Sequence, residues 1–236
     1  MGKDVGEELQ DQGFRRDRLK GSFIEPSYAG ALSFFRRKYS RDLTGVDLAI
    51  TGIPLDLTVS NRPGTRFGPE GIRRASAQHS WGPIWPWRFD PFDTLACVDY
   101  GDCHFDWGSP MEIPAAITAH IAEILAAGAA TLTLGGDHFI TYPILRAYAA
   151  KYGPLAIVQF DAHRDVEEGA PGRLDHGAMF TYAVNEGLVD PKRSVQVGIR
   201  TCFNGEKSHG MTMLYADDVH RMSAEEVAGV IRDRVG

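Results

Sequence analysis

Apolar residues along this chain gather in short runs that alternate with longer amphipathic stretches. The short runs are nearly continuous and end at Gly, Pro or Asp, as is typical of buried strands. They cover residues 47–54, 95–98, 131–134, 155–160 and 194–199. Between them, helical spacing places four apolar side chains of residues 113–127 on one stripe: Ile117, Ile121, Ile124 and Leu125. Three further helices are predicted. One starts near Pro69, a second runs from Tyr142 or Pro143 to Tyr152 with Thr141 as its N-cap, and a third covers residues 224–234.

Strands of four to six residues that alternate with helices of ten or more indicate βαβ units. The pattern therefore predicts a three-layer α/β/α fold with a mostly parallel sheet. Residues 1–45 differ, because they are polar and rich in Arg and Asp. We expect them to form an N-terminal arm over the surface or over a neighbouring subunit, followed by one α/β domain over residues 46–236. Residues 81–91 hold three Trp and three Pro, and we expect an ordered aromatic loop whose tryptophans serve packing.

Composition narrows the range of functions. The formal net charge of −6 argues against a nucleic-acid binder and gives no support for attachment to an anionic membrane. No apolar stretch reaches the roughly 18 residues of a membrane span, and the charged N-terminus lacks the apolar region of a secretory signal. The three cysteines contain no CxxC pair, which favours reduced thiols and a cytoplasmic location.

Two polar motifs follow predicted strands directly. Gly135-Gly136-Asp137-His138 comes after residues 131–134, and Asp161-Ala162-His163-Arg164-Asp165 comes after residues 155–160. Ligands of open parallel sheets bind beyond the carboxyl ends of the strands, so we expect the two motifs to meet there. In an extended chain, residues i, i+2 and i+4 share a face, which would make Asp161, His163 and Asp165 converge.

Carboxylate and imidazole side chains suit Mn²⁺, Fe²⁺ or Zn²⁺, and the lack of thiolates argues against a structural zinc site. His138 would add a nitrogen ligand, while Gly135 and Gly136 would allow a close approach of the backbone. Taken singly, a His after a strand is ordinarily a hydrogen-bonded residue, and an Asp there is often a helix cap. The two motifs together favour a metal site, with Asp137 serving the turn or supporting the ligands.

GGDHFIT and FDAHRD resemble two signature motifs of the ureohydrolase family, which includes arginase and agmatinase. Matching segments follow in the family's order from about residue 47 to the end, and the tryptophan loop is most similar to bacterial agmatinases. These segments are residues 51–54, 66–69, 72–73, 175–177 and 194–200. The resemblance implies an arginase/deacetylase-like fold.

The resemblance also implies a binuclear manganese centre that activates a bridging hydroxide. On the matching positions, Asp161 would bridge both metals, His138 and Asp165 would bind one, and His163 would bind the other. His176 would transfer a proton to the leaving amine, with a purely structural role as an equal alternative. Arg164 departs from the pattern, because the family has a small polar residue at this position.

A second family motif, Asp-x-Asp after a later strand, has no match. We therefore expect the sequence to be truncated, so that the fold is incomplete at its C-terminus and two aspartate ligands of the manganese pair are missing.

The function implied by the resemblance is hydrolysis of a guanidino group to urea and an amine. Agmatine would give putrescine, a step of polyamine biosynthesis, and the chain would assemble as a homo-oligomer, a trimer or hexamer. Three alternatives stay open: another ω-guanidino acid hydrolase of the guanidinobutyrase type, a catalytically impaired subunit of the same fold, and a metal-dependent deacetylase.

Overall fold

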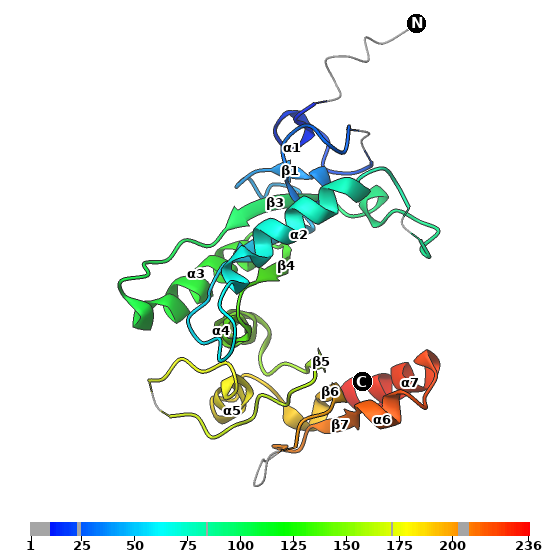
Figure 1. Ribbon diagram of the computed structural model, residues 1–236. Helices are drawn as coiled ribbons and strands as arrows, with labels where there is room; N and C mark the ends of the chain where they lie inside the picture. Colours follow the sequence, from blue (N-terminus) through cyan, green and yellow to red (C-terminus); the bar gives the residue numbers. More distant parts are fainter. Residues whose placement is uncertain (1–9, 23–24, 84, 171, 203–207) are drawn as a thin grey trace, which may run out of the picture. The chain divides into compact units, whose positions relative to one another are not determined.

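The computed structural model describes residues 10–22, 25–83, 85–170, 172–202 and 208–236. The chain divides into two compact units. Unit 1 comprises Met1–Phe105 and Ala119–Asp137, and unit 2 comprises Asp106–Thr118 and His138–Gly236. Each unit has a parallel sheet of its own (Figure 1).

The sheet of unit 1 has the strand order β1-β3-β2-β4, and its neighbouring strands pair in parallel. Its strands are β1 (Lys38–Tyr39), β2 (Leu48–Ile53), β3 (Cys97–Asp102) and β4 (Ala130–Gly135). The middle strand β2 places Ile50 beside Asp99 of β3 and Leu132 of β4. Three of the four strands had been expected from their apolar runs, and the predicted parallel sheet is confirmed.

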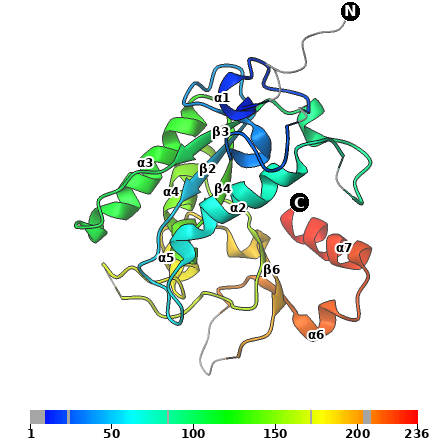
Figure 2. The same cartoon turned by 45° about the horizontal axis from the view of Figure 1, so that its top comes forward.

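Side chains alternate between the two faces of this sheet, and both faces are covered. On one face Ala49, Val98 and Tyr100 pack with Ile124 of α3 (Ile113–Ala126). On the other face Ile50 and Cys97 lie in a second apolar cluster, against which Phe34 and Phe92 pack. The helix α2 (Gly68–Ser76) reaches the second face through Arg73, which binds Asp99. Both helices run alongside the strands in Figure 2, as expected for a three-layer α/β/α arrangement.

The apolar stripe predicted for α3 is confirmed. Ile117, Ile121 and Ile124 are completely buried, and Leu125 is nearly so. Helical spacing alone was sufficient here, because the stripe faces a core rather than solvent.

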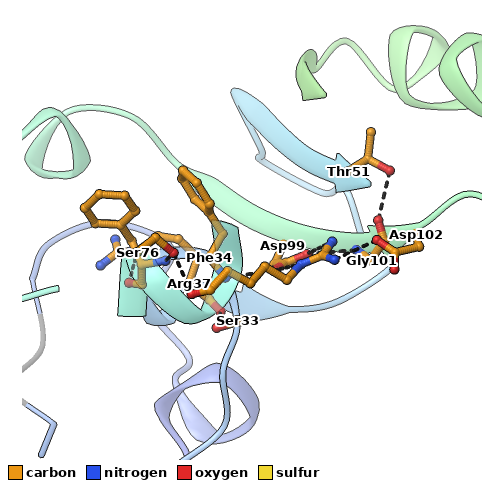
Figure 3. A network of polar contacts seen from close by, with 10 residues as sticks. Ser33, Phe34, Arg37, Thr51, Ser76, Asp99, Gly101 and Asp102 are labelled. Atoms are coloured by element: carbon orange, nitrogen blue, oxygen red, sulfur yellow. Dashed lines mark hydrogen bonds and ion pairs between the residues drawn. The ribbon is translucent and has the colours of Figure 1, made fainter. Parts of the chain in front are cut away.

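A buried polar network joins α2, β3 and the N-terminal segment (Figure 3). Arg73 donates two hydrogen bonds to the carboxylate of Asp99, at 2.8 and 3.0 Å, and a third to Asp102 at 2.6 Å. Asp99 also accepts a hydrogen bond from the backbone N–H of Phe34 at 2.8 Å. The hydroxyl of Ser76 accepts one from the N–H of Phe35. Asp99 accepts a further hydrogen bond from the backbone N–H of Gly101. The buried carboxylate of Asp99 is therefore bound by one cation and by two backbone N–H groups.

The described part of residues 10–45 is anchored by buried arginines. Arg36 pairs with Glu25 at 3.6 Å, and both side chains are fully buried. Arg16 and Arg37 both donate to the carbonyl of Gly21, each at 3.0 Å. Burial lowers the pKa of Arg16 to about 9 and that of Arg37 to about 10.

This segment contains α1 (Gln12–Arg15) and β1, which forms one edge of the sheet. Residues 1–9 and 23–24 of the expected arm lie outside the described residues. A boundary between residues 45 and 46 remains a prediction.

The sheet of unit 2 has the order β5-β6-β7 and is also parallel. Its strands are β5 (Val158–Phe160), β6 (Val195–Ile199) and β7 (Thr212–Tyr215). Its helices are α4 (Thr141–Tyr152), α5 (Met179–Asn185), α6 (Ala216–Val219) and α7 (Ala224–Val235). The last helix begins with a capping box, in which Ser223 and Glu226 bind each other's backbone N–H. Single 3₁₀ turns complete the two units: η1 (Phe34–Arg36), η2 (Thr65–Phe67), η3 (Ala77–His79), η4 (Pro91–Asp93), η5 (Pro110–Glu112), η6 (His138–Ile140) and η7 (Pro191–Arg193).

Two local predictions were wrong in detail. The strand expected over residues 155–160 contains only its last three residues, while Leu155 makes an isolated bridge to Val189. Thr141 is the first residue of α4 rather than its N-cap, and Ile140 precedes it in helical conformation. The turn η6 already bends the chain before Thr141, so its hydroxyl is not needed as a cap.

The described part of the aromatic loop lies at the surface. Trp81, Trp85 and Trp87 are all more than half exposed, so the prediction that they are packing residues was wrong. Trp87 stacks on Phe89 with ring centroids 5.9 Å apart. Among the residues that the structure describes, none of the helices combines the length and apolar character needed to cross a bilayer.

Candidate metal centre

Three of the predicted ligands come together in unit 2. One ligand atom from each of His138, Asp161 and Asp165 lies within 4.8 Å of the other two. Nδ1 of His138 is 3.0 Å from Oδ2 of Asp165 and 3.5 Å from Oδ2 of Asp161. Asp165 is the most enclosed of the three, with 7% of its side chain exposed.

The strand β5 and the chain after it place the two carboxylates. The N–H of Asp161 still bonds to the carbonyl of Val197 on β6, at 3.0 Å, so Asp161 continues the sheet pairing by one residue. Oδ1 of Asp161 then accepts the N–H of His163, a local turn that ends the extended chain. Asp165 has φ of 53°, in the left-handed region.

This geometry corrects the expected spacing argument. Asp161, His163 and Asp165 do not converge as alternate residues of an extended segment. Asp161 and Asp165 meet because the chain turns between them, and a left-handed residue completes the turn.

His163 lies on the outer side of Asp161. Its side chain is 61% exposed, and its Nδ1 is 3.4 Å from Oδ1 of Asp161, whereas His138 faces Oδ2. Asp161 therefore has one imidazole at each carboxylate oxygen. His163 is not one of the three residues whose ligand atoms converge among those that the structure describes.

Asp165 is held by groups that sequence reasoning missed. Its Oδ2 accepts a hydrogen bond from Nε2 of Gln159 at 3.0 Å, and its backbone carbonyl accepts the N–H of Phe180 at 3.2 Å. Gln159 in turn accepts a bond from Gln196. A signal was present in the sequence, since each glutamine interrupts an otherwise apolar strand.

The ring of His138 packs edge-on against Phe180 of α5, with centroids 6.1 Å apart. The helix α5 is tied to α4 by Glu186, whose carboxylate accepts two bonds from Arg146, at 2.9 and 2.8 Å, and one from the hydroxyl of Tyr142. Burial would raise the pKa of Glu186, but these bonds outweigh it and the pKa lies below its usual value. Burial and the bond to Glu186 raise the pKa of the Tyr142 hydroxyl. The bonds of Glu186 therefore connect α5, which carries Phe180, to α4 beside the site.

A cavity of about 380 Å³ opens at the cluster. It is lined by His138, Thr141, Ile157, Val158, Gln159, Phe160, Asp161 and Phe180. Because all these lining residues belong to unit 2, a small molecule in this cavity could reach His138 and Asp161.

The glycines before the site allow the close approach predicted from the sequence. Gly136 has φ of 65°, and a Cβ built there would lie 2.2 Å from the carbonyl oxygen of Ile53. Asp137 serves the turn, as expected, because its Oδ2 accepts the N–H groups of Leu57 and Thr58, each at 3.0 Å.

Two other candidates lie outside the cluster. His176 is half-buried in a turn where Asp175 caps the N–H of Gly177 and is not among the converging ligands. Arg164 is not among the converging ligands either. Its guanidinium bonds to the hydroxyl of Tyr215 at 3.1 Å and lies over that ring.

The donor set fits a divalent cation. Two carboxylates and an imidazole converge from separate segments, and such oxygen and nitrogen donors suit Mn²⁺, Fe²⁺ or Zn²⁺. A buried carboxylate beside a second one is unfavourable without a compensating positive charge. Fold and site together define a parallel α/β protein with a candidate divalent-metal centre beyond the carboxyl end of a strand.

The chain belongs to the arginase family, whose profile matches residues 46–236. It is 52% identical over 228 residues to an agmatinase from Chromobacterium violaceum, an alignment that covers 96% of this chain and 70% of that one. An agmatinase from Proteus mirabilis is 44% identical, with 84% of this chain and 63% of that one covered.

Solved structures agree with this assignment. A crystal structure of a hypothetical agmatinase from Burkholderia thailandensis superposes with a TM-score of 0.92 at 49% identity, covering 97% of this chain and 72% of that one. The proclavaminate amidino hydrolase from Streptomyces clavuligerus gives 0.81 at 35% identity, with coverage of 90% and 72%. The chain spans roughly two thirds of the length of these relatives, from 63% to 72%.

Proposed function

We propose that this chain is a metal-dependent amidinohydrolase that converts agmatine and water to putrescine and urea. The convergence of His138, Asp161 and Asp165 beside an open cavity carries the proposal. Relatives named agmatinase, 44–52% identical over most of the chain, support the choice of agmatine.

The proposed metal is manganese, which would be held by His138, Asp161, Asp165 and His163. Placement of an imidazole beside each oxygen of Asp161 supports this, because carboxylate oxygens and imidazole nitrogens suit Mn²⁺. Bound divalent ions would supply a hydroxide at neutral pH and polarise the group that it attacks.

The chain's own residues then have three tasks. Asp161 and Asp165 supply the negative charge that retains the cations. Phe180 and the cavity walls exclude part of the solvent around His138. His176 is proposed to give a proton to the departing nitrogen as its bond to the guanidino carbon breaks, so that a neutral amine leaves with urea.

A second candidate substrate is another ω-guanidino compound. The structural similarity to an amidino hydrolase named for proclavaminate favours this alternative, because that relative acts within the same fold on a different molecule. A catalytically impaired subunit of the same fold is the remaining alternative. We also propose a homo-oligomer and a cytoplasmic location; sparse cysteines without a CxxC pair support the latter.

The test is urea release by the purified chain, with Mn²⁺ added and with a chelator added, from agmatine, arginine and 4-guanidinobutyrate. Mn²⁺-dependent urea release that is fastest with agmatine is expected. Faster release from 4-guanidinobutyrate would favour the alternative substrate. A chain that binds manganese and releases no urea from any of the three would overturn the assignment as an enzyme.

A further inference from the structure

Two glutamines lie inside the sheet of unit 2, where the neighbouring strand residues are apolar. Gln159 of β5 and Gln196 of β6 are register partners, and they are 8% and 0% exposed. A buried amide costs free energy unless its polar atoms are hydrogen-bonded. These two side chains bond to each other and to the metal-site loop, so their contacts show what they stabilise.

The hydrogen bonds run in one direction. Nε2 of Gln196 donates to Oε1 of Gln159 at 2.5 Å and to the carbonyl of Arg164 at 2.6 Å. Nε2 of Gln159 then donates to Oδ2 of Asp165 at 3.0 Å and to the carbonyl of His163 at 3.4 Å. Rotating either amide by half a turn would place its oxygen against two acceptors, so the network itself fixes both orientations.

The last acceptor in this series is a ligand atom. Oδ2 of Asp165 is also the oxygen 3.0 Å from Nδ1 of His138. The backbone of Asp165 has φ of 53°, a conformation that is uncommon for residues other than glycine, although Asp adopts it more readily than most. The two glutamines hold three consecutive parts of this loop: the carbonyls of His163 and Arg164 and the carboxylate of Asp165.

We propose that Gln159 and Gln196 are positioning residues that act in series to hold the Asp165 carboxylate in its metal-binding orientation. Gln196 fixes the amide of Gln159, and Gln159 fixes the carboxylate. The inference rests on the proposed metal site. It adds to that site two residues that act through the loop they hold, Gln159 by its bond to the Asp165 carboxylate and Gln196 by its bond to Gln159.

A simpler role would be to join β5 to β6. In that case, replacement of either glutamine would lower the stability of the metal-free chain by removing the same bond between them, and metal affinity would not change. Action in series predicts a different result for metal affinity, since Gln196 reaches the Asp165 carboxylate through Gln159 and otherwise bonds only to the backbone carbonyl of Arg164.

The experiment measures Mn²⁺ binding to the 236-residue chain through the electron paramagnetic resonance signal of free Mn²⁺. Four proteins are compared, namely the wild type, Q159M, Q196M and the double variant. Methionine matches glutamine in length and removes the donor. Q12M is the matched control, because Gln12 is equally buried, at 4% exposed, but belongs to unit 1. Urea unfolding of each metal-free protein gives its stability.

We expect Q159M to raise the Mn²⁺ dissociation constant by about 10- to 100-fold, the usual effect of losing a hydrogen bond to a ligand. Q196M should raise it less, the double variant should come close to Q159M and fall short of the sum of the two single losses, and Q12M should leave it unchanged. Unchanged affinity in Q159M, or additive losses in the double variant, would overturn the series. If Q159M does not fold, the proposal is tested by Q196M alone. An unchanged Mn²⁺ affinity in Q196M would then overturn the proposal. A wild type that binds no Mn²⁺ would instead overturn the proposed metal site.

Discussion

Nδ1 of His138 lies 3.0 Å from Oδ2 of Asp165, although the two residues come from different motifs. One precedes α4 and the other follows β5, and the contact exists only once the chain of unit 2 has folded. Each residue would have little affinity for a metal alone. Their meeting with Asp161 is therefore the feature on which the proposed chemistry depends.

Replacing either partner should abolish tight metal binding. We expect H138A and D165N each to weaken Mn²⁺ binding by more than about 100-fold, beyond the effect of losing a supporting hydrogen bond. Isothermal titration with Mn²⁺ measures the loss. D217N is the control, because Asp217 is an exposed carboxylate of unit 2 paired with Arg221. Retention of wild-type affinity by D165N would show that Asp165 is not a ligand.

Arg73 should matter far more for stability than its neighbour Arg74. Its side chain is 9% exposed and pairs with Asp99, which is completely buried (Figure 3). R73M leaves that carboxylate without its cation, so we expect a loss of about 3–5 kcal/mol in the free energy of unfolding. R74M removes an exposed i,i+4 pair with Glu70 and should cost less than about 0.5 kcal/mol. Urea unfolding of both variants measures the two losses in the free energy of unfolding. Equal losses would contradict the greater contribution expected of the Arg73–Asp99 pair.

The sequence was sufficient where structure follows from local pattern. The apolar runs predicted β2, β4 and β6, and helical spacing predicted the buried stripe of α3, because burial of apolar side chains dominates those elements. The meeting of His138 with Asp161 and Asp165 was also predicted, since each motif directly follows an apolar run that ends at a Gly or an Asp.

Elements stabilised by polar burial were not predictable. Arg36 and Glu25 look like surface residues, yet their pairing is fully buried. The strand β7 was also missed, because its apolar run Met213-Leu214-Tyr215 is short and only half-buried. The sequence marks the two glutamines as polar interruptions of apolar strands, but their bonds to the loop and the left-handed Asp165 depend on contacts between β5, β6 and the loop.

The Glu186 carboxylate should make unit 2 sensitive to acid. Hydrogen bonds from Arg146 and Tyr142 keep its pKa below the usual value despite burial, so its stabilising effect is full above the unfolded pKa, about 4.3, and is lost as pH falls through the folded pKa. Because Glu186 and Arg146 are both partly exposed, we expect E186Q to cost only about 1 kcal/mol at pH 7. Urea unfolding at pH 7 and pH 3 tests this. The cost should shrink at pH 3, and a cost that stays constant would contradict the ionised pair.

His120 should make unit 1 sensitive to pH in a higher range. Its Nε2 lies 2.6 Å from Oγ1 of Thr51, whose hydroxyl donates to the carbonyl of Gly101, so the ring donates to Thr51. Burial lowers the pKa of His120, with Arg41 acting in the same direction and Glu123 and Asp102 opposing it.

A lowered folded pKa means that the unfolded chain binds a proton more readily. The stability contributed by neutral His120 is therefore full above its unfolded pKa, about 6.5, and is lost as pH falls below that value towards the folded pKa. H120Q keeps a donor for Thr51 but cannot titrate. We expect the free energy of unfolding to fall less between pH 7.5 and pH 5.5 in H120Q than in the wild type, as measured by urea unfolding. An identical decrease in both proteins would exclude His120 as the titrating group.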